Sequence, residues 1–351
     1  MGVKLINQMN MNKLFWLLVI SFLSYATFAQ ERSGFQIWKK NFKIDTTRII
    51  DLSDQLGLYT YTTSSQNNLA LKDLATNKKL KLQPNGQTNL GFGFNYKWIR
   101  LGAAFGLPFL NKDDEKYGET KRTDLQLNIF MRSLGIDTYF QKYRGFYLNN
   151  INDHIDSTYA FYPNLSDMET FALGLSAYYF FNSKKFSYKA AYTRNQIQKK
   201  SAGAFILGGF FNLYNAHSPN GFVPTELPDS IRDNYTLRRF ETNIIGISIG
   251  YTYTLVFLKR LYINASFVPG IGLRFSEITR TDERDILAPV MTSSATLRFS
   301  LGYEGKHLYA GIKSITSINS YNYNTIEISS AIGNLQFYVG KRFQLKKKNK
   351  K

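Results

Sequence analysis

One pentapeptide has the spacing of a catalytic serine. The run from Gly246 to Gly250, with Ser248 at its centre, matches the G-x-S-x-G pattern of serine hydrolases. In those enzymes a sharp turn from strand to helix lifts the serine above a sheet. Here the alternation of apolar and small residues continues through the pentapeptide, and no helical pattern follows it. We therefore interpret both glycines as small positions on one face of a strand.

A serine nucleophile also needs a histidine base on a neighbouring segment. The chain has three histidines, of which His154 and His217 fall in expected loops and His307 at an expected turn. We interpret all three as surface residues. The acidic residues beside His154 are too sparse for a metal site, because no second ligand cluster accompanies them. An enzyme that hydrolyses or acylates lipid through Ser248 or His307 is kept as an alternative function.

Two acidic clusters, Asp113 to Glu115 and Asp282 to Asp285, fall in expected outer loops. They could hold divalent cations that bridge to lipopolysaccharide phosphates, or they could be solvated loop tips. No P-loop and no complete G-x-G-x-x-G motif occurs in the sequence. We therefore expect no resident metal and no cofactor.

Basic residues recur on the polar faces of alternating segments, against only Asp124, Asp137 and few other acids. Rings of charge set the sign preference of a pore, so one hypothesis is a narrow channel that favours small anionic solutes. The competing hypothesis is a closed wall whose arginines pair with lumenal acids or with a folded loop. The seven candidate lumen-lining residues are Lys97, Arg100, Arg132, Lys189, Arg274, Arg298 and Arg342.

The elements that must position these side chains are clearest between Phe240 and Phe275. In the first half, isoleucine, tyrosine and leucine occupy the odd positions and glycine, serine and threonine the even ones. The second half repeats the alternation after a short turn at Leu258 to Arg260. This period of two predicts an antiparallel hairpin with one apolar face and one small, polar face.

The length of these segments decides what the apolar face meets. Strands of soluble sheets mostly run about 5 to 6 residues, whereas strands of about 9 to 11 residues cross a bilayer at a tilt. The alternation from Phe240 to Phe275 exceeds that length in both halves. The sequence therefore predicts an all-β fold, a transmembrane antiparallel up-and-down β-barrel with lipid outside and a polar lumen inside.

The N-terminal segment, residues 1–29, is typical of an export signal. Two lysines precede a twelve-residue apolar stretch, and Thr27 and Ala29 fit the positions that a signal peptidase reads. The apolar stretch is too short for a membrane helix, which needs about 20 residues. The chain has no cysteine, which excludes disulfides and an acylated N-terminal cysteine.

Composition agrees with a single barrel. Aromatic residues make up 16% of the chain, and the mean hydropathy is -0.27 with 44% hydrophobic residues. Such values exclude a helical membrane bundle but suit a wall in which every second residue is polar. We expect a periplasmic or lumenal lead-in at residues 30–54, a barrel at 55–345 and a basic periplasmic tail at 346–351.

Alternating short and long connections set the number of strands. Tight periplasmic turns and larger outer loops are consistent with the sequence if Leu56 to Leu82 and Phe186 to Leu213 each contribute one crossing. This predicts about twelve strands, with ten or fourteen as alternatives. Phe343 lies where barrel-insertion machinery reads a terminal aromatic residue. The lysine-rich tail could bind nucleic acid, but lipid head groups are nearer partners, so we expect no nucleic-acid binding.

Several stretches resemble a domain-of-unknown-function family, number 4421. They are residues 89–98 (NLGFGFNYKW), 106–114 (GLPFLNKDD), 199–203 (KKSAG) and 268–273 (VPGIGL). The resemblance implies an exported, barrel-forming protein of Bacteroidetes-type bacteria, placed in the bacterial outer membrane. It carries no catalytic residues that could be assigned here.

The expected function is therefore non-enzymatic: a pore, a transport accessory or an envelope-structure protein. Its expected partners are outer-membrane lipid and lipopolysaccharide, the barrel-insertion machinery and small anionic solutes. A further alternative is a surface protein that binds a ligand or adheres through the loops Asn149 to Met168 and Tyr214 to Arg238.

Overall fold

The computed structural model describes residues 44–345, apart from residues 87, 98, 107–112, 155–161, 233–234, 236 and 281–282. The expected signal peptide, the first part of the lead-in and the basic tail lie outside the described residues. Within the described part, no helix combines the length and apolar character needed to cross a membrane.

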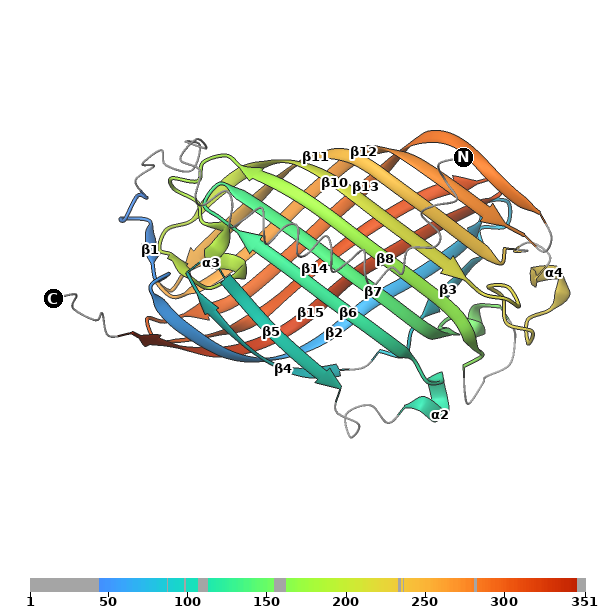
Figure 1. Ribbon diagram of the computed structural model, residues 1–351, viewed down its shortest axis with the longest axis horizontal. Coiled ribbons are helices and arrows are strands. Elements are labelled where there is room, and N and C mark those ends of the chain that lie inside the picture. The colour runs from blue at the N-terminus through green and yellow to red at the C-terminus, as the bar shows by residue number, and fades with distance from the viewer. Residues whose placement is uncertain are drawn as a thin grey trace, which may run out of the picture. The chain divides into compact units, whose positions relative to one another are not determined.

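Ten strands form a closed antiparallel barrel. Each pairs with the next, and the last strand returns to the first along its whole length, from Gln344 beside Gln55 to Ile326 beside Asp73 (Figure 1). In order around the ring they are β2 (Gln55–Asp73), β3 (Lys79–Gln83), β7 (Leu134–Leu148), β8 (Asn164–Phe180), β10 (Ala202–His217), β11 (Arg239–Phe257), β12 (Leu261–Thr279), β13 (Arg284–Glu304), β14 (Leu308–Tyr323) and β15 (Ile326–Gln344).

Three further strands widen one half of the wall. They are β4 (Thr88–Tyr96), β5 (Ile99–Gly106) and β6 (Lys121–Phe130). β4 pairs with the first half of β2 and β5 pairs with β4, while β6 pairs with β7. The short β3 fills the place between β2 and β7 only at the other end. The predicted all-β antiparallel barrel is confirmed; its closed ring has ten strands, one of the two alternatives to the expected twelve, and β4, β5 and β6 are additional to that ring.

The alternation seen in the sequence has the predicted orientation. Ile247 is 64% exposed on the outer face, whereas the neighbouring Ser248 is 6% exposed on the inner face. Leu273 and Arg274 repeat this pattern on β12, at 45% and 4%. A Cβ added to Gly246 would lie 2.6 Å from Cζ of Phe210, so the inner face there has room only for glycine. The barrel is therefore apolar outside and polar inside, as a wall in lipid must be.

The two ends of the barrel differ. One end, here called the terminal end, holds the start of β2, the finish of β15 and the tight turns at residues 258–260 and 305–307. The opposite end, here called the loop end, holds the connections that contain α2 (Asp114–Tyr117), η4 (Ile151–Asp153) and α4 (Asp229–Arg232); Figure 1 labels α2 and α4 there. Of the surface loop expected at Tyr214 to Arg238, the first four residues belong to β10, and Phe222, Val223 and Leu237 in the remainder are buried.

The loop end is closed by an apolar core. Inward side chains from β2, β3, β7, β8, β10, β11, β12, β14 and β15 pack together with residues of the 218–238 connection. Because these strands surround the lumen, the cluster spans its cross-section. We call this cluster the loop-end core; its fully buried members include Leu69, Leu71, Leu80, Leu82, Leu148, Met168, Phe222, Phe240 and Ile328.

Candidate functional site in the barrel lumen

The connection between β8 and β10 folds into the terminal half of the lumen. The first part of the segment expected as one crossing, Phe186 to Leu213, is not wall: it forms the helix α3 (Tyr188–Tyr192) and the short strand β9 (Gln196–Gln198). Ser187 caps the helix, its Oγ accepting a hydrogen bond from the backbone N–H of Ala190 at 3.1 Å. The expectation of one crossing between Phe186 and Leu213 is confirmed, because β10 alone crosses. We call residues 186–198 the plug.

Aromatic stacking and sheet pairing hold the plug in place. The ring of Tyr188 stacks on Phe180 of β8 with centroids 4.3 Å apart, and Phe130 of β6 meets it edge-on at 5.0 Å. Tyr192 donates a hydrogen bond to Asn264 of β12 at 2.8 Å. On the other side β9 pairs with β1 (Ile49–Asp51), which precedes the barrel. The plug therefore touches the inner faces of strands from different sides of the wall.

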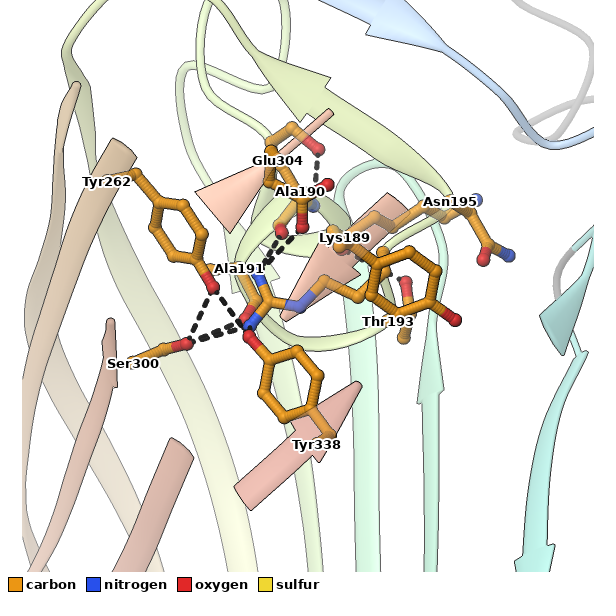
Figure 2. A network of polar contacts seen from close by, with 12 residues as sticks. Lys189, Ala190, Ala191, Thr193, Asn195, Tyr262, Ser300, Glu304 and Tyr338 are labelled. Atoms are coloured by element: carbon orange, nitrogen blue, oxygen red, sulfur yellow. Dashed lines mark hydrogen bonds and ion pairs between the residues drawn. The ribbon is translucent and has the colours of Figure 1, made fainter. Parts of the chain in front are cut away.

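Arg194 ties the plug to the wall through charge. Its side chain is 1% exposed, and Nη1 lies 3.2 Å from Oε1 of Glu304 at the end of β13. Nη2 donates to Ser300 Oγ at 2.9 Å and also to Tyr338. The guanidinium carbon lies 4.8 Å from the ring centroid of Tyr262 and 4.7 Å from that of Tyr338. Figure 2 shows Tyr262, Ser300, Glu304 and Tyr338 converging on this point.

Glu304 is shared between two guanidiniums. Its Oε2 lies 2.6 Å from Nη2 of Arg342 on β15, whose side chain is also 1% exposed. Arg342 in turn donates to the backbone oxygen of Arg194 at 2.9 Å. Removing one partner of a buried ion pair costs about 3–5 kcal/mol, because the other charge stays buried without compensation. Loss of the Glu304 carboxylate alone would therefore leave both buried guanidiniums unpaired and weaken docking of the plug.

Three further cations line the lumen, and we call them the basic belt: Arg274 lies toward the loop end, whereas Arg298 and Lys313 lie level with the plug. Arg298 contacts Asp137 of β7 through Nη2, and its carbon lies 4.8 Å from the ring centroid of Tyr178. Its Nε and Nη1 are buried without a hydrogen-bond partner in the described part of the chain. Buried donors of this kind are costly unless a partner arrives.

The other two members of the belt have no carboxylate partner among the described residues. The guanidinium of Arg274 lies over Tyr321 at 4.7 Å, and its Nε has no hydrogen-bond partner there. Lys313 on β14 is 7% exposed, and no hydrogen bond or ion pair joins its ammonium to the described residues. The belt therefore carries more positive charge than the neighbouring acids neutralise.

A small cavity lies next to the belt, on the loop-end side of the plug. Its volume is about 10 Å³, room for one water molecule. Tyr178 and Val268 separate it from the plug, since both also belong to the cluster around Tyr188. Its polar lining consists of Ser176, Asn212, Ser248, Ser294, Thr296 and Ser317.

The remaining sequence-predicted residues lie at the terminal end. Arg100 on β5 donates to the backbone oxygen of Thr193, so it contacts the plug. Arg132 lies half-buried in the turn between β6 and β7. Lys189 is on α3 rather than on the wall; burial lowers the pKa of its ammonium, partly offset by Asp51. Lys97 does not line the lumen, because it lies exposed in the turn after β4, over the ring of Tyr96.

Ser248 has no histidine beside it. It faces the lumen in mid-strand, level with Gly208 of β10, and its Oγ is buried without a hydrogen-bond partner in the described structure. The residues from Gly208 to His217 cover roughly 30 Å of strand. His307 lies past the end of β13 at the terminal end, and His154 lies next to Lys79 at the loop end. The arrangement of a serine triad is therefore missing from the described residues.

The acidic clusters do not assemble a metal site. Among the described residues, no group of three or more histidine, cysteine, aspartate or glutamate side chains could hold a metal ion. Asp285 instead accepts a hydrogen bond from Tyr323 and lies 3.8 Å from Arg280. Asp114 accepts one from Asn85.

Sequence reasoning missed Arg194, Glu304 and Lys313. Arg194 lies in a segment that the sequence predicts as part of a crossing. In the structure its φ of 68° belongs to a turn within the plug, and strand alternation does not predict such a turn. One local signal was present. The capping residue Ser187 precedes Tyr188, Ala191 and Tyr192, which recur at helical spacing and are all buried.

These features define the class: a transmembrane β-barrel whose lumen is closed by an apolar core at one end and by an ion-paired plug at the other. The chain belongs to the family described as Domain of unknown function (DUF4421), whose model matches residues 43–343. The resemblance noted in the sequence is thereby confirmed. No curated protein sequence matches the chain.

Solved structures of outer-membrane barrels are similar in fold. The chain matches the outer membrane protease OmpT from Escherichia coli at 8% identity and a TM-score of 0.37, over 84% of this chain and 98% of that one. It matches the translocator domain of autotransporter NalP from Neisseria meningitidis at 8% and 0.33, over 93% and 97%. It matches the P. putida toluene transporter TodX at 8% identity and a TM-score of 0.28, over 84% of this chain and 91% of that one. Identities this low concern the barrel fold and assign no activity here.

Proposed function

We propose that the protein is a non-enzymatic transport accessory of the bacterial outer membrane that holds an anionic group in its lumen. The observation that carries the proposal is the basic belt, in which Arg274 and Arg298 keep buried donors without partners among the described residues. A guanidinium binds carboxylate or phosphate with charge-assisted hydrogen bonds. In a lumen of low effective dielectric such bonds are stronger than in water.

The two closures decide how an anion reaches the belt. The loop-end core is apolar and spans the lumen, whereas the plug is held by an ion pair and hydrogen bonds. The sequence left two hypotheses, an anion-selective channel and a closed wall whose arginines are paired. Arg298 and Arg342 fit the second hypothesis, since Arg298 pairs with Asp137, and Arg342 pairs with Glu304 and donates to the plug. An open channel has no counterpart in this resting state. Release of the plug is therefore the step that exposes the belt to water.

The orientation and the export route belong to the same proposal. Short turns at the terminal end are typical of the periplasmic side of such barrels. Phe343 is 40% exposed near the finish of β15, as a terminal residue read by barrel-insertion machinery would be. The plug would then face the periplasm, and the loop-end core would face the cell exterior with its lipopolysaccharide.

Cysteine accessibility tests the proposal, because the chain has no cysteine of its own. Ser248→Cys places one thiol, here called the reporter thiol, in the cavity next to the belt with little change in size. The protein is studied in lipid nanodiscs, intact and with residues 184–201 replaced by a Gly-Ser turn. That replacement is possible because Asn182 already hydrogen-bonds Gly203, which brings the ends of the connection together.

Two thiol reagents of opposite charge give the result. The intact protein should protect the reporter thiol, and the form without the plug should react faster with a sulfonate-bearing methanethiosulfonate than with its trimethylammonium counterpart. Arg274→Gln should reduce that preference, since Arg274 makes no ion pair within the described structure whose loss would disturb the wall. Equal rates for the two reagents, or a faster reaction with the cationic one, would refute a basic lumen. Free reaction in the intact protein would refute closure by the plug.

A further inference from the structure

The wall of the barrel has one seam in its described part. Among the described residues β5 pairs only with β4, and β6 pairs only with β7. The two strands are consecutive in the chain and approach each other, yet no ladder of hydrogen bonds joins them there (Figure 1). Every other neighbouring pair around this half of the barrel is hydrogen-bonded.

The seam lies in the part of the wall that faces lipid. Leu101 and Phe105 of β5 and Leu125 and Leu127 of β6 are exposed on the outer face, as on the rest of the barrel. Unpaired backbone groups at this depth cost several kcal/mol each, so barrels normally close completely. An edge left open at this position therefore calls for a partner that reaches it from the membrane.

Space behind the seam lies on its loop-end side. Behind Gly102 and Ala104 the lumen is filled by a tyrosine cluster, in which the hydroxyls of Tyr59 and Tyr61 lie 2.9 and 3.0 Å from a Cβ added to Gly102. Gly106 at the end of β5 is exposed, and a Cβ there would meet only Asn89, at 3.5 Å. On β6 the inner residue Gln126 is exposed as well, although it accepts a hydrogen bond from Asn334 across the lumen.

The charge behind the seam is basic. Arg100 of β5 lies half-buried over the ring of Tyr59, 4.0 Å from its centroid. Arg122 of β6 donates to Asn89 at 2.5 Å, while its Nη1 is buried without a partner in the described structure. Asp124 also faces this space, but its Oδ2 already accepts hydrogen bonds from two residues of β7. The unmatched donor at the seam is thus a guanidinium.

We propose that the seam between β5 and β6 is a lateral port for an anionic lipid, whose head group enters beside Arg100 and Arg122 while its acyl chains stay along the apolar outer face. Charge complementarity selects an acidic head group over a zwitterionic one. The closures at both ends leave the seam as the route from membrane to lumen. This deepens the proposed function, on which it rests for the basic lumen, by naming a membrane amphiphile as the ligand.

Photo-crosslinking from two adjacent residues tests the port. Ala104→Cys places a benzophenone label on the inner side of the seam, beside the tyrosine cluster, and Ala103→Cys points the same label into lipid one residue away. Each protein is labelled while unfolded, refolded and placed in vesicles of equal parts phosphatidylglycerol and phosphatidylcholine. The mass of the intact protein then reports which lipid has been attached.

A port predicts a difference between the two positions. Label at 104 should capture phosphatidylglycerol in about fivefold excess, whereas label at 103 should capture both lipids equally. Arg100→Gln with Arg122→Gln should abolish the excess at 104 without changing the result at 103. No lipid at 104, or the same ratio at both positions, would overturn the port.

A free anion is distinguished in the same vesicles. Millimolar inorganic phosphate should leave the lipid adducts at 104 unchanged; their loss would show that the site takes a soluble anion and would overturn the lipid assignment. Failure of the port leaves the proposed function intact if the reporter thiol still prefers the anionic reagent. If the reporter thiol does not react faster with the anionic reagent, the proposal of a basic lumen is refuted, whatever the lipid adducts show.

Discussion

The two halves of the lumen are closed by different physical means. At the loop end, Leu69, Phe222, Phe240 and Ile328 belong to a core that resembles the interior of a soluble protein. At the terminal end, a helical plug is held by aromatic packing around Tyr188 and by polar contacts of Arg194 and Tyr192. The loop-end core has no single contact whose loss would release it, whereas the plug adds a buried ion pair that depends on Glu304. The comparison favours the plug as the closure that opens.

The largest effect on this comparison should come from Glu304→Gln, which leaves two buried guanidiniums without their carboxylate. Docking of the plug should weaken by about 3–5 kcal/mol. In the Ser248→Cys background, the reaction rate of the reporter thiol with the sulfonate reagent should therefore rise by about two orders of magnitude or more.

The matched control is Glu241→Gln, which removes an exposed carboxylate paired with Arg239 at the loop end. Exposed pairs contribute about 0–1 kcal/mol, so the accessibility of the reporter thiol should stay unchanged. An equal response to both substitutions would show that Glu304 does not hold the plug.

Phe222→Ala tests the other half. Its ring is fully buried in the loop-end core, and truncation of a buried phenylalanine costs about 3–5 kcal/mol of stability. Urea unfolding in lipid vesicles, followed by tryptophan fluorescence, should show that loss. The reporter thiol should nevertheless stay protected, because the plug is untouched. Exposure of that thiol in this variant would mean that the two closures are not independent.

The sequence predicts the wall better than its contents, for a physical reason. Between Phe240 and Phe275 the residues on both sides of the turn at 258–260 face either lipid or lumen, so a period of two appears and predicts the strands and the face on which each residue lies. The plug is surrounded by protein on all sides, and Phe186, Tyr188 and Tyr192 therefore look like the apolar face of another strand. Alternation arises where the two faces of a strand contact different surroundings, lipid on one side and a polar lumen on the other. The plug contacts neither lipid nor bulk water, so its sequence carries no such signal.

The candidate site was predicted in part for the same reason. Arg274, Arg298 and Arg342 lie on the inner face because their strands alternate without interruption. Glu304 ends its strand, and its importance arises only when Arg194 reaches it from a segment 110 residues away. Such a pairing leaves no local signal. The seam between β5 and β6 likewise depends on pairing, which a single strand pattern does not contain.

A smaller effect is expected from Tyr192→Phe. The substitution keeps the ring beside Tyr188 but removes the hydrogen bond to Asn264, whose Oδ1 then stays buried without that donor. Loss of one such bond costs about 1 kcal/mol. Exposure of the reporter thiol should rise about fivefold. An effect as large as that of Glu304→Gln would show that the hydrogen bond from Tyr192 holds the plug as strongly as the ion pair does.

The smallest effect should come from Lys189→Met on the plug helix, and its sign is opposite. Burial lowers the pKa of the Lys189 ammonium in the docked plug, so the undocked plug binds the proton more tightly. Docking is therefore penalised at neutral pH, and the penalty falls as the pH rises through the lowered pKa. Lys189→Met should slow the reaction of the reporter thiol by less than about tenfold at pH 7. The ratio of the reaction rates with and without Lys189→Met should approach one in alkaline buffer. Taking this ratio cancels the ionisation of the reporter thiol, which both proteins share. A ratio that does not change with pH would show that the charge of Lys189 does not affect docking of the plug.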